Sequence, residues 1–371
     1  MNIRARFALF AAALLLTAAN ASALQPSAPS ARPAAGTFAV TAIDVGTGLS
    51  VLVEGHDFTL LYDAGSNDDV ARGAANRTVA YIRAVRPDIT TIDHLILSHP
   101  HKDHSELMPD VLSTFQIRNV WNSGSLNNIC SYRALLQNVR NETGVVYHDA
   151  LGGPGTYHAN FAAKSGGCYG APAPHVVIDV PRGSRISSAP VALGANARMT
   201  ILHADGTQTS NLNAASVVVR LDLGSRHILL PGDSEAGPRA DPSTPPTASS
   251  VERQLLNCCA AGLRSDILVA GHHGSKTSSR VEFLDAVGAT NFIVSAGPTK
   301  YATVTLPDAE VISEYGRRGT VWRTDLNDST CGANPAKIGP DRDGRPGGCD
   351  NVRVTIDAAG AIAIGYDRRH D

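Results

Sequence analysis

The 371-residue sequence has no long hydrophobic run beyond its first 23 residues, no excess of positive charge and no fibrous repeat. After residue 23, no stretch approaches the roughly eighteen apolar residues that a membrane-spanning helix needs, so we expect no membrane span in the mature chain. The formal charge of −2 gives no electrostatic basis for avid nucleic-acid binding. A hydrophobic content of 43% with 18% charged residues excludes a disordered chain and supplies material for a large core.

The first 23 residues have the organisation of a secretory signal peptide. Arg4 and Arg6 precede an apolar run over residues 7–19, and Ala21-Ser22-Ala23 offers small residues for cleavage. Residues 24–36 are rich in Pro, Ala and Ser, which predicts a flexible leader. We therefore expect an exported protein, periplasmic or extracellular, with one domain over residues 37–371.

Six cysteines in an exported chain favour disulfide bonds over metal binding. Cys331 and Cys349 bracket a loop rich in Gly, Pro and Asp, and they form the first expected pair. Cys130 and Cys168 bracket another irregular stretch and form the second. The adjacent residues Cys258-Cys259 could bridge each other, pair elsewhere or stay free, and the sequence alone does not choose among the alternatives.

Strand-like and helical segments alternate along most of the chain. Short β-rich runs separated by Gly and Asp occupy residues 38–63, and a helix expected over residues 70–85 opens the alternation. This alternation predicts a layered α/β fold rather than an all-β one. Irregular composition predicts three surface insertions, near residues 144–174, 237–250 and 326–350.

The densest group of ligand-type residues follows the apolar run Leu95-Ile96-Leu97, and a short helix is expected after it, from residue 106. The group consists of His99, His101, Asp103 and His104. In an extended turn, His99 and His101 point to one side, while Asp103 and His104 can face a second position nearby. Imidazole and carboxylate ligands favour zinc or a similar divalent metal, and this arrangement suits two ions better than one.

Two later apolar strands end in the same residue types. Residues 227–230 lead into Pro231-Gly232-Asp233, and residues 267–270 lead into Gly271-His272-His273. Asp233 is the natural bridging ligand for two metal ions held by the first cluster. Because three distant strands all end in His or Asp, we expect them to converge at one edge of the sheets. Asp44 and Asp63 also sit at strand ends, where each could orient a metal-bound imidazole or simply cap a turn.

These segments together resemble the metallo-β-lactamase superfamily and, more narrowly, the soluble hydrolase domain of the ComEC/Rec2 competence proteins, which take up DNA. The resemblance rests on Asp44–Gly48, Tyr62–Gly65, His99–His104, Leu230–Asp233 and Gly271–Ser275, with Asn213–Ser216 and Arg323–Asp325 matching the narrower group. It implies an αββα sandwich of two mixed β-sheets flanked by helices, with two divalent metal ions at one edge.

The resemblance also implies a set of metal ligands. His99 and His101 would hold the first ion, while Asp103, His104 and one histidine of the 272/273 pair would hold the second, with Asp233 between them. We favour His272 as the ligand because it comes first after the strand, which leaves His273 for substrate or for supporting a ligand. The chain departs from the family where many members have a further His for the first metal, since it has Asn211-Leu212-Asn213 there. It also has Leu306-Pro307 where ComEC-like domains have His-Pro.

The expected function is metal-dependent hydrolysis of a phosphodiester by an activated hydroxide, with Zn²⁺ as the expected metal and Mn²⁺ as an alternative. Asp103 and Asp233 would orient the hydroxide. Residues expected to contact substrate or support the ligands are Asp44, Asp63, Asn213, His273, Ser275 and Lys276, although Lys276 could equally be an ordinary surface lysine. The substrate could be a small or polymeric phosphoester, DNA included. A lactone or β-lactam hydrolase, or a metal-containing binding module without turnover, remains an alternative.

Overall fold

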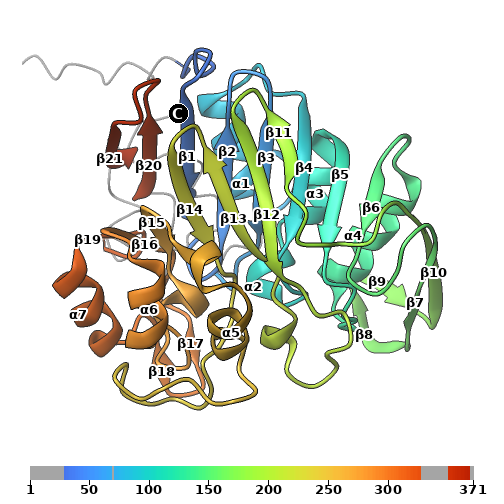
Figure 1. The fold of residues 1–371 in the computed structure, drawn as a ribbon. Coiled ribbons are helices and arrows are strands. Elements are labelled where there is room, and N and C mark those ends of the chain that lie inside the picture. The colour runs from blue at the N-terminus through green and yellow to red at the C-terminus, as the bar shows by residue number, and fades with distance from the viewer. Residues whose placement is uncertain (1–28, 69–70, 327–349, 368–371) are drawn as a thin grey trace, which may run out of the picture.

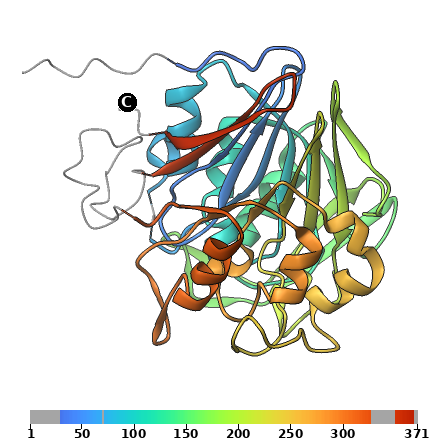
Figure 2. The same ribbon diagram turned by 60° about the vertical axis from the view of Figure 1, so that its left-hand side comes forward.

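Two β-sheets pack face to face and carry helices on both outer faces (Figure 1 and Figure 2). The computed structural model describes residues 29–68, 71–326 and 350–367. Within these ranges the architecture is the αββα sandwich that the sequence predicts, and both sheets are mixed. The expected signal peptide over residues 1–23 lies outside the described residues.

The larger sheet has ten strands in the order β21-β20-β1-β2-β3-β4-β5-β6-β10-β7. Every residue of β1, β2 and β3 is buried, because one face of the sheet meets the other sheet and the opposite face meets helices. Strands β3 and β4 run parallel, so their carboxyl ends lie at the same edge. The strands are β1 (Phe38–Ala42), β2 (Ser50–Glu54), β3 (Thr59–Ala64), β4 (Thr91–Leu97), β5 (Gln116–Asn122), β6 (Val146–His148), β7 (Gly155–Phe161), β10 (Val176–Arg182), β20 (Asn351–Ile356) and β21 (Ile362–Asp367).

The smaller sheet has seven strands in the order β11-β12-β13-β14-β15-β16-β19. Its first four strands pair antiparallel, whereas β14, β15, β16 and β19 run parallel, so the ends of β14 and β15 also share an edge. The strands are β11 (Val191–Gly194), β12 (Ala197–His203), β13 (Val218–Leu223), β14 (Arg226–Leu230), β15 (Ile267–Val269), β16 (Asn291–Val294) and β19 (Thr320–Arg323). Two separate hairpins are formed by β8 (Lys164–Cys168) with β9 (Ala171–Ala173), and by β17 (Lys300–Tyr301) with β18 (Val304–Thr305).

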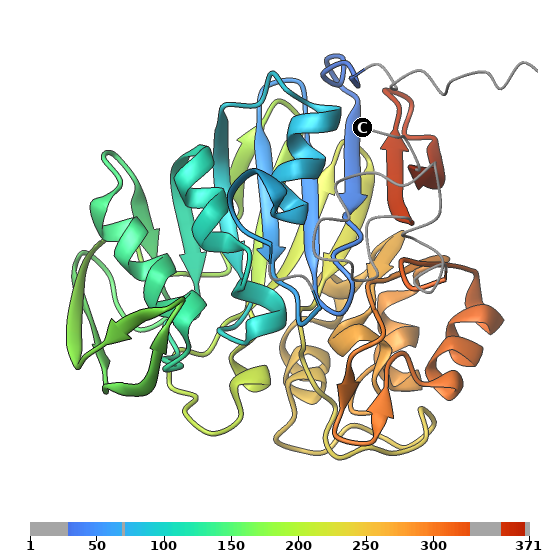
Figure 3. The same cartoon turned by 180° about the vertical axis from the view of Figure 1, so that it is seen from behind.

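Six helices cover the outer faces of the sandwich. Helices α1 (Arg77–Val85), α3 (Met108–Thr114) and α4 (Cys130–Asn141) pack on the larger sheet, as Figure 3 shows. Helices α5 (Val251–Leu263), α6 (Val281–Val287) and α7 (Ala309–Arg318) pack on the smaller sheet (Figure 1). A third apolar core lies between the two sheets. None of the helices in the described ranges has the length and apolar character needed to cross a membrane.

Two element boundaries near the site differ from the sequence prediction. Helix α1 begins at Arg77 rather than residue 70, because the side chain of Asn76 caps it by accepting a hydrogen bond from the N–H of Val79 at 3.3 Å. Glycine 73 and its neighbours form the short 3₁₀ turn η1 (Gly73–Ala75) before this cap. A one-turn helix, α2 (Lys102–Ser105), begins before the expected helix start at residue 106, so Asp103 and His104 lie within a helical turn.

Residues 144–174 are not the irregular insertion that their composition suggests. They contain β6, β7, β8 and β9, and β7 pairs with β10 at the edge of the larger sheet. Tyr157, Ala159 and Phe161 alternate inward along β7, a period of two that the intervening polar residues and Gly155 mask in the sequence. By contrast, residues 237–250 contain turns and no helix or strand, and residues 327–349 lie outside the described part of the chain.

Two disulfide bonds lie in the described ranges. The predicted Cys130–Cys168 bond is confirmed and ties the start of α4 to the β8–β9 hairpin. Cys258 and Cys259 bridge each other within α5, which is one of the alternatives left open by the sequence. The expected pair Cys331 and Cys349 lies outside the described residues.

Removing the Cys130–Cys168 bond should destabilise the protein far more than removing the vicinal bond. The first bond joins residues 38 positions apart and restricts the unfolded chain, so replacing both cysteines by Ser should cost about 2–4 kcal/mol of unfolding free energy. The Cys258→Ser/Cys259→Ser variant is the matched control, with an expected loss of about 1 kcal/mol. Urea unfolding followed by circular dichroism measures both, and equal losses would contradict the prediction.

Glu252 of α5 has a buried carboxyl group that binds the backbone at residues 279 and 280, a few residues after the 271–274 turn. It accepts hydrogen bonds from the backbone N–H groups of Ser279 and Arg280, the latter at 3.2 Å. Burial raises the pKa of Glu252 from 4.5 to about 8, although these bonds and Arg280 pull it down. The folded protein therefore holds a proton on Glu252 at neutral pH.

This raised pKa predicts that stability falls as pH rises. Between about pH 4.5 and pH 8 the folded state binds a proton that the unfolded chain has released, so the contribution of Glu252 is complete below pH 4.5 and is lost as pH approaches 8. Glu252→Gln mimics the protonated carboxyl, so wild type should lose stability relative to this variant from about pH 5 to pH 8. Urea unfolding across this range measures the difference, and a constant difference, or one that favours wild type at high pH, would mean that the carboxyl is ionised.

Candidate metal centre

Four strand ends converge at one edge of the sandwich. Strands β3 and β4 deliver Asp63 and the His99–His104 segment from the larger sheet, while β14 and β15 deliver Asp233 and the 272/273 pair from the smaller sheet. The sheets are joined here by Tyr62, whose hydroxyl donates to the carbonyl oxygen of Val217 at 2.8 Å. The convergence expected from the sequence is therefore present.

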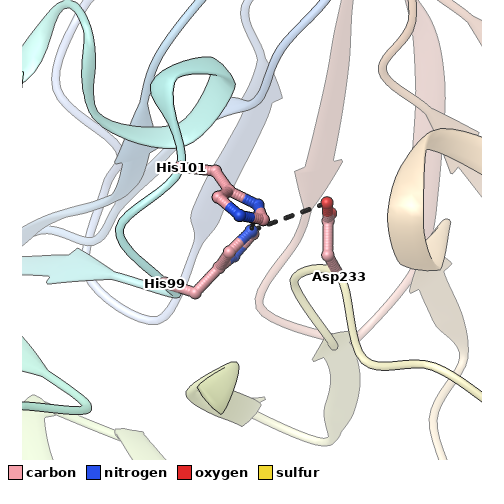
Figure 4. Close-up of side chains that lie close together, drawn as sticks. All are labelled: His99, His101 and Asp233. Atoms are coloured by element: carbon pink, nitrogen blue, oxygen red, sulfur yellow. Dashed lines mark hydrogen bonds and ion pairs between the residues drawn. The ribbon is translucent and has the colours of Figure 1, made fainter. Parts of the chain in front are cut away.

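Two groups of three potential metal ligands lie side by side at this edge. The first consists of His99, His101 and Asp233, and the second of Asp103, His104 and His273; within each group the ligand atoms lie within 4.8 Å of one another. Figure 4 shows the first group, in which both imidazoles face Asp233. Nε2 of His99 and Nδ1 of His101 are 2.9 Å apart. The structure thus brings together five of the six ligands predicted from the sequence.

The histidine grouped with Asp103 and His104 is His273, whereas the sequence favoured His272 for that position. Nε2 of His273 lies 3.7 Å from Oδ2 of Asp103, and its Nδ1–H donates to the carbonyl oxygen of Ser295 at 2.9 Å, which leaves Nε2 with a free lone pair. Both histidines have left-handed backbones, with φ of 48° and 53°. Because the chain turns sharply in the 3₁₀ segment η3 (Gly271–Gly274), the order of residues after the strand does not decide which ring faces Asp103.

Three buried polar atoms of these groups have no hydrogen-bond partner among the described residues. They are Nε2 of His104, Nε2 of His273 and Oδ1 of Asp233. His104 Nε2 lies 3.1 Å from Oδ1 of Asp233, but the contact lacks the direction of a hydrogen bond. Unpaired buried polar atoms cost free energy, and three that meet at one point are suited to a cation. The residues therefore fit divalent metal ions, and their imidazole and carboxylate donors are those of zinc and related metals.

Asp63 supports His104, whereas Asp44 caps a turn. Nδ1–H of His104 donates to Oδ2 of Asp63 at 2.8 Å, and the N–H of Ser98 donates to Oδ1 at 2.7 Å. A carboxylate in this position fixes the imidazole and turns Nε2 toward Asp233. The Asp44 carboxylate instead accepts from the backbone N–H groups of Gly46 and Asp350. Of the two roles that the sequence left open, Asp63 thus orients an imidazole and Asp44 caps a turn.

Gly65 allows the strand β3 to pass against the ligand segment. A Cβ at this position would lie 2.3 Å from the backbone nitrogen of His104, closer than any side chain permits. The close approach of these two backbone segments therefore requires glycine at position 65.

Burial and mutual charge set the protonation of the site. Burial lowers the pKa of His99 and of His101, so both rings are neutral and able to bind a metal. Burial also acts on His104, but Asp233 and Asp63 outweigh it and raise its pKa well above the ordinary value. Burial would raise the pKa of Asp103, yet His273 and His104 hold it well below the usual range. Ionised carboxylates thus retain protons on neighbouring imidazoles, and metal binding must displace them.

Three residues at the site carried no signal in the sequence. Tyr301 of β17 donates its hydroxyl to Oδ2 of Asp103, and its ring stacks on His273 with centroids 6.3 Å apart. Asn67 donates to the same oxygen of Asp103 at 3.2 Å. Glu235, two residues after Asp233, faces His272 at 3.3 Å.

The remaining predicted residues lie beside the two groups rather than within them. Asn213 donates its amide to Oε1 of Glu235 at 3.3 Å. The buried Ser275 hydroxyl accepts hydrogen bonds from Thr277 and Arg239 and so shapes the turn after His273. Lys276 pairs with Glu310 at 2.7 Å, which agrees with the surface alternative rather than a substrate contact.

Comparisons with known proteins give a family and several similar folds. A family model described as the metallo-beta-lactamase superfamily matches residues 43–297, and a search of curated proteins found no match. One similar solved structure is the metallo-beta-lactamase fold protein YhfI from Bacillus subtilis, with 13% identity over 78% of this chain and 97% of that chain and a TM-score of 0.42.

Two further solved structures are similar at the same level. The metallo hydrolase Igni18 from the archaeon Ignicoccus hospitalis has 11% identity over 86% of this chain and 99% of that chain, with a TM-score of 0.43. A diphosphatase from the PhnP family has 14% identity over 78% of this chain and 95% of that chain, with a TM-score of 0.38. The narrower likeness to ComEC proteins stays a prediction. The matched residues 43–297 make up more than half of the chain and include both ligand groups, so the protein belongs to the metallo-β-lactamase superfamily.

Proposed function

We propose that this protein is an exported two-metal hydrolase that cleaves phosphodiesters. The observation that carries the proposal is the position of the buried Asp233 between the two ligand groups. Its Oδ1 lies 3.1 Å from Nε2 of His104, and its Oδ2 lies 3.7 Å from Nε2 of His99. A carboxylate whose two oxygens face different sets of imidazoles is suited to bridge two ions.

The side chains of the site have separate roles in this proposal. When bound, divalent metal ions lower the pKa of water and stabilise negative charge on substrate oxygens. His99 and His101 would hold the first ion, and Asp103, His104 and His273 would hold the second. Asp103 and Asp233 would accept hydrogen bonds from the attacking water and orient it. Tyr301 and Asn67 fix the carboxylate of Asp103 by donating to its Oδ2.

A phosphodiester is the substrate class that best uses such a site. Two neighbouring cations can stabilise both the attacking and the leaving oxygen of an in-line displacement at phosphorus. The resemblance to ComEC proteins extends the proposal to DNA, whereas the net charge of −2 does not support avid binding of a long polyanion. Lactones and β-lactams are competing substrates, and a binding module without turnover is the competing class. The lack of a histidine at Asn211-Leu212-Asn213 favours that last alternative.

Replacing Asp233 should disable both metal binding and hydrolysis. In Asp233→Asn, bound metal should fall from about two equivalents to one or fewer, and hydrolysis of bis(p-nitrophenyl) phosphate should fall by at least about a hundredfold, because one side chain serves both ions. Elemental mass spectrometry and p-nitrophenolate release measure the two effects. Asp179→Asn is the matched control, since Asp179 is exposed on β10 and pairs with His158. Full activity in Asp233→Asn would contradict the two-metal mechanism.

A panel of four substrates separates the competing functions. Metal-loaded wild type should turn over bis(p-nitrophenyl) phosphate with a higher kcat/KM than a lactone or a β-lactam, and DNA cleavage in the same panel tests the nuclease extension. A chelator added in excess should abolish the activity. Faster opening of the lactone or the β-lactam would replace the proposed reaction. If a protein carrying two metal equivalents turns over none of the four, the binding module is the better description.

A further inference from the structure

His272 lies at the candidate centre but outside the two groups of three ligands. Its Nε2 is 3.7 Å from Oδ2 of Asp233, and its side chain is 18% exposed. We propose that His272 is the third imidazole ligand of the first metal position, in place of the histidine that the chain lacks at Asn211-Leu212-Asn213. The inference rests on the proposed two-metal function, and it assigns one histidine of the 272/273 pair to each ion.

The two oxygens of the Asp233 carboxylate face two different pairs of imidazoles. Oδ1 faces the second group, with Nε2 of His104 at 3.1 Å and Nε2 of His273 at 3.9 Å. Oδ2 faces His99 and His272, each with its Nε2 at 3.7 Å. His272 therefore shares its side of the carboxylate with a member of the first group.

The first position is also the one that needs a further donor. Without His272 it has His99, His101 and Asp233, whereas the second has Asp103, His104 and His273 in addition to a share of Asp233. Zinc sites commonly use four ligands, and an imidazole is a donor of the type already present. A fourth protein ligand from His272 would make the two positions equal in number of donors.

The segment that lacks the family histidine supports His272 indirectly. Asn211 and Asn213 each donate an amide hydrogen to the carboxylate of Glu235 at 3.3 Å. Oε1 of Glu235 in turn lies 3.3 Å from Nδ1 of His272. The asparagines thus hold the carboxylate that contacts the substituting ring.

The contacts of Nδ1 leave Nε2 of His272 available as a ligand. Nδ1 lies 2.7 Å from Oγ1 of Thr277, whose hydroxyl donates to Oγ of Ser275, so the Thr277 oxygen accepts the hydrogen on Nδ1. With Nδ1 protonated, the lone pair of the neutral ring is on Nε2, the atom directed toward Asp233. The left-handed φ of 48° at His272 is unfavourable for a residue with a Cβ, so the backbone strain occurs at a residue that faces Asp233.

Metal stoichiometry tests the assignment without reference to any substrate. Wild type should bind two equivalents of Zn²⁺, measured by elemental mass spectrometry and calorimetric titration. His272→Ala and His273→Ala should each keep one tight equivalent and bind the other at least about 100-fold more weakly. His99→Ala/His272→Ala should still keep one equivalent, because both changes affect the same ion, whereas His272→Ala/His273→Ala should keep none. His175→Ala, at an exposed position, is the matched control and should bind two.

A second variant, Glu235→Gln, tests the contact that supports His272. It also keeps the assignment testable if His272→Ala does not fold. Glu235→Gln should weaken the same equivalent that His272→Ala weakens, by about 10- to 100-fold, with an unchanged far-ultraviolet circular dichroism spectrum. Cobalt-loaded protein gives a further readout, since loss of His272 should alter the visible absorption of one ion only. Wild-type affinity for both ions in His272→Ala and in Glu235→Gln would overturn the assignment while leaving the two-metal function intact. Fewer than two equivalents in wild type would overturn the two-metal function itself.

Discussion

The buried carboxylate of Asp233 is the constraint on which the rest of the site depends. A charge that is 2% exposed is costly unless other charges or a metal compensate it, and here imidazoles from both sheets surround it. Side chains can be held this closely only if the strands that carry them end at one edge. The parallel pairs β3–β4 and β14–β15, and the Tyr62 bridge between the sheets, satisfy that condition. The sandwich is therefore the means by which distant ligands reach one carboxylate.

Much of this arrangement could be predicted from the sequence because its signals are local. Strongly apolar runs stop one or two residues before His99, Asp233 and the 272/273 pair, so the sequence shows strand ends and ligand types together. The sandwich itself followed from the family resemblance, and its confirmation lies in the three separate cores. The sequence could not show which of His272 and His273 lies near Asp103. Both residues have left-handed backbones, which interrupt the regular alternation of side-chain directions after a strand.

Other features could not be predicted because they depend on contacts between distant residues. Tyr301 reaches Asp103 across 198 positions of sequence, and nothing around Tyr301 distinguishes it from an ordinary loop residue. Strand β7 is an edge strand with one exposed face, so polar residues and Gly interrupt its apolar pattern. In both cases the tertiary structure, rather than local propensity, determines the role of the segment.

The missing family histidine has a different meaning once these contacts are considered together. Taken alone, Asn211 and Asn213 suggest a first metal position that has lost a ligand and an enzyme that has lost turnover. In the structure, both asparagines bind Glu235, Glu235 contacts His272, and His272 faces the same oxygen of Asp233 as His99. A buried carboxylate and a left-handed histidine each cost stability, and a metal ion bound by both would offset that cost. The contacts therefore favour a first metal position in which His272 supplies the missing ligand. A complete first position in turn favours an enzyme over a binding module.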